Sequence, residues 1–461
     1  MSERRQPHAG ETLPTHVKAG YALGDHSINV QLAAMSLFYL FFLTEVAGLR
    51  PSLAGLVMLV ARIVDAVTDP AMGRLSDRTR LRWGRRRPYF LIGAIPFGLT
   101  FAALWMPMSG ASESVKFLAY TSAYILNTLC STVLAVPYMA LLPELALSYQ
   151  ERTSANTFRS IGVVVAILLT AVGVRPLVQA FGGDAAAWTS MGAVLGVWVA
   201  LPWFVVHRVS FERPGFRRET ETGFLQGLGH LVRHQSYRRL CGLYLASRIA
   251  VDVVGAMLIF YFSYWIGRAG DFPPALALML IVVIATLPAW LRVSRRFDKR
   301  SLFMLGAGWW ILVQLGILVI GPDDPRWLVF GLMGLAGIGY GMADMMPWAM
   351  LGDVIDDDEL ASGERREGLY AGVFTFLRKL GGASGVALAG FVLDVTGFRA
   401  GAEQSEAALF AIRGLTALVP AVFLVVAIFV ARGYPISRRR HAEILEQLAA
   451  RRQVQAGSRS V

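Results

Sequence analysis

Long apolar runs, separated by short polar connections, dominate the hydropathy pattern of this sequence. Each run holds roughly 20 residues or more, which is enough for an α-helix to cross about 30 Å of hydrocarbon. A helix satisfies its own backbone polar groups in lipid, and these runs exceed the roughly ten residues of a barrel strand. We therefore predict an all-α membrane protein with about twelve transmembrane helices, near residues 20–48, 52–75, 88–108, 115–145, 158–180, 186–207, 239–266, 273–294, 301–320, 325–352, 368–396 and 408–432.

The composition supports this class. Of the 461 residues, 55% are hydrophobic and only 16% are charged, and the mean hydropathy is +0.50. These values are atypical of soluble domains. The net charge of +12 does not indicate a nucleic-acid partner, because the basic residues lie in short connections between apolar runs. Cys130 and Cys241 lie inside apolar runs and define no disulfide framework.

Basic residues gather in alternate connections, as the positive-inside rule describes for cytoplasmic loops. Two connections hold dense clusters: Arg74, Arg78, Arg80, Arg82, Arg85, Arg86 and Arg87 after the second run, and Arg295, Arg296, Lys299 and Arg300 after the eighth. Together with an even helix count, this pattern places both termini in the cytoplasm. Because no cleavage site follows a short apolar core, we expect the first span to remain in the mature protein.

The longest connection, residues 208–238, divides the chain into two halves. An internal sequence repeat supports this division, since VPYMALLPEL at 136–145 resembles MPWAMLGDVI at 346–355. Many secondary transporters are built from such repeated halves. The predicted organisation is a segment at 1–19, a six-helix half at 20–207 with the cation site, the central loop, a second six-helix half at 239–432 and a tail at 433–461.

Three charged residues stand inside the second apolar run. Arg62, Asp65 and Asp69 are three and four residues apart, so they share one helix face, and Thr68 adds a hydroxyl. Each charge left in lipid would cost about 2.5–3.5 kcal/mol, so they must face an interior cavity. Two acids beside one base favour a site for Na⁺ or H⁺, and the alternative is a static ion cluster that clamps helices.

Further polar residues lie in other spans. Arg248 and Asp252 are four residues apart, which predicts an intrahelical ion pair. Arg62, Arg248 and Asp252 are the predicted members of an intramembrane charge network. Candidate substrate contacts are Asp25, Asn29, Tyr138, Arg159, Trp348 and Lys379. Glycine-rich runs at 331–341 and 381–390 predict close helix packing. The acidic stretch at 353–368 predicts a solvated inner loop whose arginines bridge to its carboxylates.

Several motifs resemble those of one family over nearly the whole chain. They are ARIVDAVTDPAMG at 61–73, RWGRRRPYFLIG at 82–93, the acidic elements at 352–368 and TFLRKLGGASG at 375–385. With these motifs the chain resembles the glycoside-pentoside-hexuronide:cation symporters, a melibiose permease-like family of the major facilitator superfamily. The resemblance implies the major facilitator fold, with two pseudo-symmetric six-helix halves.

The resemblance also implies roles for individual residues. Asp65 and Asp69 match the family's cation-site carboxylates, Thr68 and Thr132 match polar positions of that site, Lys379 matches a site-associated lysine, and Arg159 matches an arginine of the sugar pocket. Two sugar-binding aspartates of the melibiose permease are replaced here by Asn29 and Ala135. This departure argues against melibiose-type galactoside recognition.

We therefore predict a Na⁺- or H⁺-coupled symporter of a glycoside, pentoside or uronide, working as a monomer in the lipid bilayer of a bacterial cytoplasmic (inner) membrane. A uronide would fit the intramembrane cations Arg159, Arg248 and Lys379. One alternative is a Na⁺-coupled transporter of lysolipids, which the related branch of the superfamily includes. Another is a membrane enzyme or receptor, but the sequence contains no nucleotide, metal or nucleophile motif and predicts no cofactor besides the coupling ion.

Overall fold

The computed structural model describes residues 12–81, 83–146, 149–213, 229, 231–294, 296–364 and 366–458. Within these ranges the elements are helices, and no β-strand is present. The helices form two compact units: residues 1–218 with 387–405, the N-terminal unit, and residues 219–386 with 406–461, the C-terminal unit. Arg82, Arg295, Arg365, most of the predicted 1–19 segment and the middle of the 208–238 connection lie outside the described residues.

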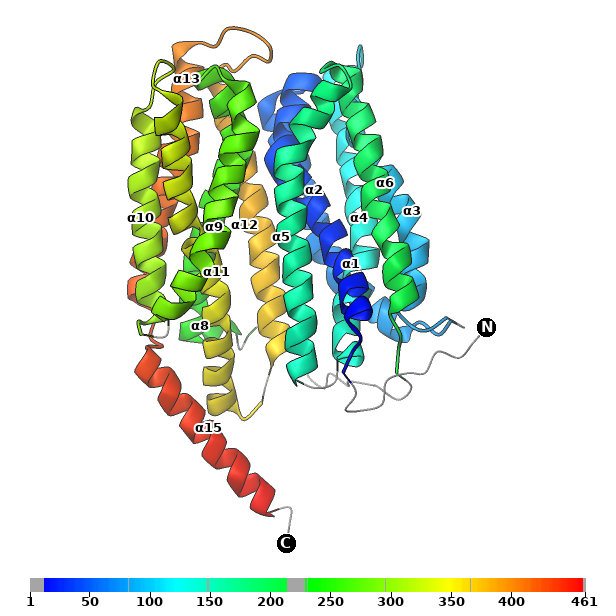
Figure 1. Cartoon of the computed structure of the whole chain (residues 1–461), viewed down its shortest axis with the longest axis vertical. Helices are drawn as coiled ribbons and strands as arrows, with labels where there is room; N and C mark the ends of the chain where they lie inside the picture. Colours follow the sequence, from blue (N-terminus) through cyan, green and yellow to red (C-terminus); the bar gives the residue numbers. More distant parts are fainter. Residues whose placement is uncertain are drawn as a thin grey trace. The chain divides into compact units, whose positions relative to one another are not determined.

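The N-terminal unit contains six long helical segments (Figure 1). They are α1 (Thr15–Ala34), which continues through the π-helices η1 (Met35–Tyr39) and η2 (Phe42–Val46), α2 (Pro51–Arg78), α3 (Arg87–Ala103), α4 (Glu113–Leu145), α5 (Tyr149–Ala180) and α6 (Ala185–Val209). The closest neighbours are α3 with α6, α1 with α5, and α2 with α4. The pairing of α2 with α4 and of α1 with α5 brings together the polar residues described below.

The described part of the C-terminal unit also consists of helices. Its elements are α8 (Gln235–Phe260), η3 (Tyr261–Trp265), η4 (Ala269–Asp271), α9 (Phe272–Ser294), α10 (Lys299–Val319), α11 (Arg326–Ser362), α12 (Glu367–Val395), α13 (Glu406–Arg413), η5 (Gly414–Leu418), α14 (Val419–Arg432) and α15 (Arg438–Ser458). Helix α11 packs against α8, α9 and α10. The last residues of α12, from 387 onward, belong to the N-terminal unit, where Gly390 lies against the backbone of Pro51 and Gly55.

Each of the twelve predicted spans corresponds to a helix or to a run of consecutive helices. Ten of these in the described part of the chain are long and apolar enough to cross a membrane. The other two predicted spans are α1 with η1 and η2, and α3. Helix α1 carries buried polar residues that lower its hydropathy, and α3 has 17 residues. The prediction of an all-α membrane protein is confirmed.

Local sequence explains where several helices begin and end. Proline stands in the first turn of α2 and of α3, where its missing N–H costs nothing. Ser112 and Asp184 accept backbone N–H groups at the starts of α4 and α6. Helix α11 ends at Gly363, whose φ of 77° is the left-handed conformation that glycine adopts readily.

Glycines let helices approach closely, as the glycine-rich runs predict. A Cβ on Gly339 of α11 would lie 2.6 Å from the carbonyl oxygen of Gly306 on α10. A Cβ on Gly337 would lie 2.4 Å from the carbonyl oxygen of Met279 on α9. These glycines therefore hold α11 against both neighbours, which is the role that small residues have in membrane helix packing.

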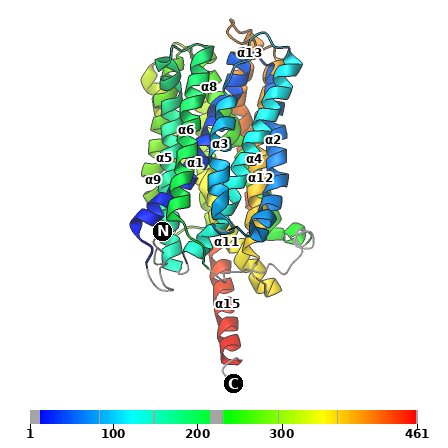
Figure 2. The same cartoon turned by 90° about the vertical axis from the view of Figure 1, so that its right-hand side faces the viewer.

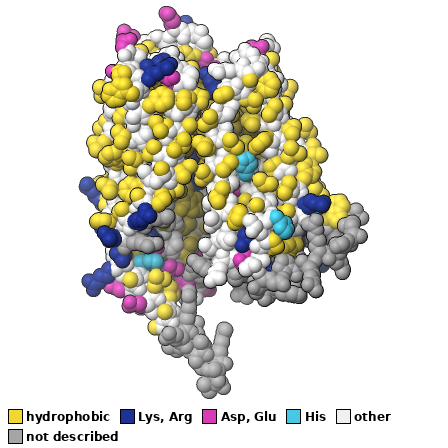
Figure 3. Space-filling view, in the orientation of Figure 1, with side chains coloured by type: hydrophobic (Ala, Val, Ile, Leu, Met, Phe, Trp, Pro, Cys, Tyr) yellow, Lys and Arg dark blue, Asp and Glu magenta, His cyan; other side chains and the backbone are white. Residues whose placement is uncertain are grey.

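The surface agrees with a membrane environment. Hydrophobic side chains cover most of the face shown in Figure 3, and many of the acidic and basic side chains lie toward its two ends. Exposed large hydrophobic side chains on the long helices include Leu99, Val197, Leu312 and Phe429. Such side chains are stable in contact with lipid and would be unfavourable in water. Figure 2 shows α15 extending below the helices of its unit.

Candidate functional site

Two carboxylates of α2 and one hydroxyl of α4 converge inside the N-terminal unit. Thr132 Oγ1 lies 3.1 Å from Asp65 Oδ1 and 3.1 Å from Asp69 Oδ1. A hydroxyl carries a single hydrogen, so it can donate a full hydrogen bond to only one of two ionised carboxylates. The oxygens of Asp65, Asp69 and Thr132 thus form a compact group of hard ligands, and Asp65 is buried.

Arg62 supplies one positive charge beside these two acids. Its Nη1 lies 3.5 Å from Asp65 Oδ2, and its guanidinium lies over the ring of Tyr124 at 6.0 Å. Thr68 does not donate to the carboxylates in this structure, because its hydroxyl donates to the backbone oxygens of Val64 and Asp65. Arg62 and Asp65 thus form an ion pair between residues i and i+3 of α2, beside the contact of Thr132 with both acids.

A second polar group joins α1 to α4 and α5. Arg159 forms an ion pair with Asp25 through Nε, and its Nη2 lies 3.3 Å from Asp25 Oδ1. Tyr138 donates to Asp25 Oδ2 at 3.0 Å, and its ring lies 5.3 Å from the Arg159 guanidinium. Three of the predicted substrate contacts are therefore in direct contact with one another. Asn29 is nearby and donates to the backbone oxygen of Asp25 at 2.8 Å.

His26 lies beside this group and has structural partners. Its Nε2 accepts from Trp198 Nε1 at 3.0 Å, so the ring is the tautomer with a proton on Nδ1, which faces the Gly162 oxygen at 3.2 Å. This neutral ring ties α1 to α5 and α6.

An ion triad lies in the C-terminal unit. The predicted pair of Arg248 and Asp252 is present, with Arg248 Nε donating to Asp252 Oδ2 at 2.8 Å. Arg248 Nη1 also donates to Asp344 Oδ1 at 3.0 Å. Asp344, on α11, is not among the residues predicted from the sequence. A single acid inside the apolar run GIGYGMADMMPW was the available indication.

Trp348 and Lys379 are the other predicted residues of this unit. Trp348 follows Asp344 by one helical turn and packs edge-on against Phe374 and Tyr244, at ring distances of 5.0 and 6.0 Å. Lys379 is half-buried on α12 and interacts with another group. Because these residues belong to the C-terminal unit, the association of Lys379 with the cation site and the role of Trp348 as a substrate contact stay predictions.

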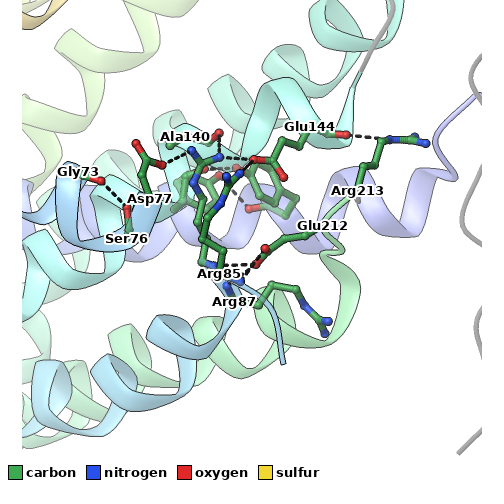
Figure 4. A network of polar contacts seen from close by, with 12 residues as sticks. Gly73, Ser76, Asp77, Arg85, Arg87, Ala140, Glu144, Glu212 and Arg213 are labelled. Atoms are coloured by element: carbon green, nitrogen blue, oxygen red, sulfur yellow. Dashed lines mark hydrogen bonds and ion pairs between the residues drawn. The ribbon is translucent and has the colours of Figure 1, made fainter. Parts of the chain in front are cut away.

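Charged residues from the connection between α2 and α3, from the last turn of α4 and from the residues after α6 form the network in Figure 4. Arg85 and Arg86 both form ion pairs with the buried carboxylate of Glu144, and Arg86 also pairs with Asp77 at 2.7 Å. Glu212, just after α6, accepts the backbone N–H groups of three consecutive arginines, 85 to 87, at 2.7, 2.7 and 2.9 Å. Its carboxylate thus caps the start of α3, where the helix dipole favours negative charge.

Glu212→Gln should lower the free energy of unfolding by about 2 kcal/mol, because a neutral amide oxygen replaces a charge that accepts three N–H groups. The midpoint of thermal unfolding in detergent measures this effect. Glu446→Gln, at an exposed position on α15, is the matched control and should leave the midpoint unchanged. Equal midpoints for both variants would show that the cap contributes nothing.

The acidic stretch 353–368 differs from the predicted solvated loop, because α11 remains helical as far as Ser362. Its carboxylates have partners on several elements: Lys299 with Asp353, His441 with Asp356, His234 with Asp357, and Arg366 with Asp358. These partners help to explain the helix, since Lys299 and Arg366 offset the charge of two of its acids and the histidines form close contacts with two others. Burial raises the pKa of nearby Tyr434, so its hydroxyl stays protonated and donates to the Met350 oxygen.

The described residues contain no group of three or more His, Cys, Asp or Glu side chains arranged to hold a metal ion. Two carboxylates and a hydroxyl are instead suited to a monovalent hard cation or a proton.

Comparisons with known proteins point to one family. Residues 20–438 match the family described as MFS/sugar transport protein. An uncharacterized symporter of Synechocystis sp. is 30% identical over 96% of this chain and 98% of its own length. The glucuronide carrier protein homolog of Escherichia coli is 27% identical over 95% and 96%. The crystal structure of a D-xylose-proton symporter has a TM-score of 0.70, 14% identity, and coverage of 91% and 98%.

Proposed function

Because the chain belongs to the MFS/sugar transport protein family of symporters, we propose that it carries a sugar-like solute across the membrane together with Na⁺ or H⁺, by alternating access. The family resemblance read from the motifs is confirmed, and so are the major facilitator fold and the conclusion that the protein is a transporter and not an enzyme. The coupling ion, the substrate, the cytoplasmic termini and the bacterial inner membrane are part of the proposal.

The convergence of Asp65, Asp69 and Thr132 is the observation that carries the coupling step. Oxygen ligands bind Na⁺, and a carboxylate can bind H⁺, so these three side chains provide the groups that either coupling ion needs. The ion and the substrate then stabilise the same loaded state, which is the thermodynamic condition for coupling.

The group of Asp25, Arg159 and Tyr138 supports binding of a hydroxylated substrate in the same unit. It offers carboxylate oxygens, a guanidinium and an aromatic ring within one small region. Hydroxyl groups can both donate to the carboxylate and accept from the guanidinium. We assign these three residues, with Asn29, to the substrate path.

Purified protein reconstituted in liposomes provides the test. An inward Na⁺ gradient and an inward H⁺ gradient are imposed in separate experiments, and uptake of labelled glycosides, uronides and lysolipids is measured. We expect accumulation of a sugar under one of the two gradients, and its abolition by an ionophore that dissipates that gradient. Accumulation of a lysolipid alone would contradict the sugar assignment, and uptake that is indifferent to both gradients would contradict symport.

A further inference from the structure

Arg248 holds two carboxylates in different ways. Asp252 binds it through both oxygens, which satisfies the guanidinium along one edge. Asp344 binds only Nη1, through a single oxygen. The side chain of Asp344 is 32% exposed, whereas that of Asp252 is 10% exposed. Asp344 is therefore the acid of this triad that is available to a ligand.

The position of Asp344 along α11 excludes contact with lipid. Asp353, further along the same helix, pairs with Lys299 at the start of α10. At 1.5 Å per residue, Asp344 lies about 13 Å from this charged end, inside the span. An exposed carboxylate at that depth would be costly against hydrocarbon, so we expect Asp344 to face water.

Trp348 lies on the same face, one turn after Asp344. Trp348 is 39% exposed, and its ring packs edge-on against Phe374 and Tyr244, whose rings stack on each other at a centroid distance of 4.0 Å. A carboxylate and a partly exposed indole one helical turn apart offer two kinds of contact that a sugar ring can make. The carboxylate accepts hydrogen bonds from hydroxyls, and the indole covers the apolar face of the ring.

We propose that Asp344 and Trp348 form a binding half-site in the C-terminal unit for a neutral, hydroxyl-rich ring, and that this half-site disfavours uronides. This inference rests on the proposed sugar transport and narrows its substrate class.

The pairing of the arginines argues against an anionic substrate. Arg159 is already paired with Asp25, and Arg248 with two acids, so a uronate would have to displace an internal carboxylate from either one. It would also meet the negative charge of Asp344. Lys379 also has an interaction of its own, and Arg378, half-buried beside it on α12, is a further cation that a uronate could use.

The test compares ligands that differ only at C6. Methyl glucosides and galactosides are compared with the corresponding methyl uronides, and affinity is measured by thermal stabilisation of the purified protein at saturating coupling ion. We expect the wild type to bind a neutral glycoside more tightly than its uronide. Asp344→Asn should weaken the neutral ligand by about tenfold or more and reduce the discrimination between the two.

Trp348→Ala should weaken both ligands to a similar degree, because stacking does not depend on charge at C6. Two exposed residues elsewhere in the unit serve as controls: Asp323→Asn and Trp327→Ala should leave both affinities unchanged. If Asp344→Asn fails to fold, Asp344→Glu and Trp348→Phe replace it in the test. Each should change the affinity, although Glu retains a carboxylate and Phe retains an aromatic ring.

The outcomes separate the two proposals. Failure of the wild type to bind or transport any sugar would contradict the proposed function itself. Tighter binding of the uronide, especially if Arg378→Gln removes it, would overturn the neutral half-site while leaving sugar symport intact. Unchanged affinities in both Asp344→Asn and Trp348→Ala would also overturn it.

Discussion

Asp65→Asn and Asp69→Asn are each expected to abolish ion-driven accumulation while leaving membrane insertion largely intact. Each substitution removes one negative charge and keeps the shape of the side chain. Because the oxygens of both acids lie 3.1 Å from Thr132 Oγ1, loss of either charge takes away a main ligand of the proposed cation. We expect the apparent affinity for the ion to fall by about 100-fold or more, corresponding to roughly 3 kcal/mol.

Uptake into liposomes under an imposed ion gradient measures this loss, and the amount of protein in the membrane fraction measures insertion. Thr132→Ser is the matched control, since it retains the hydroxyl and should keep most of the activity. Exchange of substrate without an ion gradient should survive in the aspartate variants better than accumulation does. If both variants still concentrate substrate, Asp65 and Asp69 are not the coupling residues.

Arg248→Ala is expected to destabilise the C-terminal unit by about 3–5 kcal/mol, because it leaves buried Asp252 and the adjoining Asp344 without their shared cation. Combining it with Asp252→Ala should recover part of the loss, since one of the two uncompensated charges is removed. Adding Asp344→Asn should recover more. The midpoint of thermal unfolding in detergent, measured for the single, double and triple variants, gives the comparison.

Uptake is measured in parallel, because it separates stability from a direct role in binding. If the single and double variants have equal defects in stability, Asp252 does not act through its ion pair with Arg248. A double variant that regains stability without regaining uptake would assign Arg248 to the substrate path.

The helices and several of their polar pairs follow from the sequence alone. In a bilayer, backbone hydrogen bonds must close within each span, so hydropathy and length are enough to locate the spans. Contacts within one helix depend only on its pitch of 3.6 residues. For that reason the pairing of Arg248 with Asp252 and the common face of Asp65 and Asp69 were predictable from spacing.

The remaining contacts required the tertiary structure. Asp25 and Arg159 are 134 positions apart, and Glu212 and Arg85 are 127 apart, so no helical period connects them. The acidic stretch after Asp353 was predicted to be a solvated loop because several partners of its carboxylates, such as Lys299 and His234, lie far away in sequence and could not be anticipated.

Asp344 is the clearest example of a residue whose contacts required the tertiary structure. Its sequence neighbours do not reveal whether an acid in a span is paired, exposed or both. Helix packing decides this, because it brings Arg248 of α8 against one oxygen of Asp344 and leaves about a third of that side chain open. The sequence by itself determined which helices form and which residues share a face. The packing of helices distant in sequence decided which charges neutralise one another and which stay available to an ion or a substrate, because charge pairing depends on distances of a few ångströms in space.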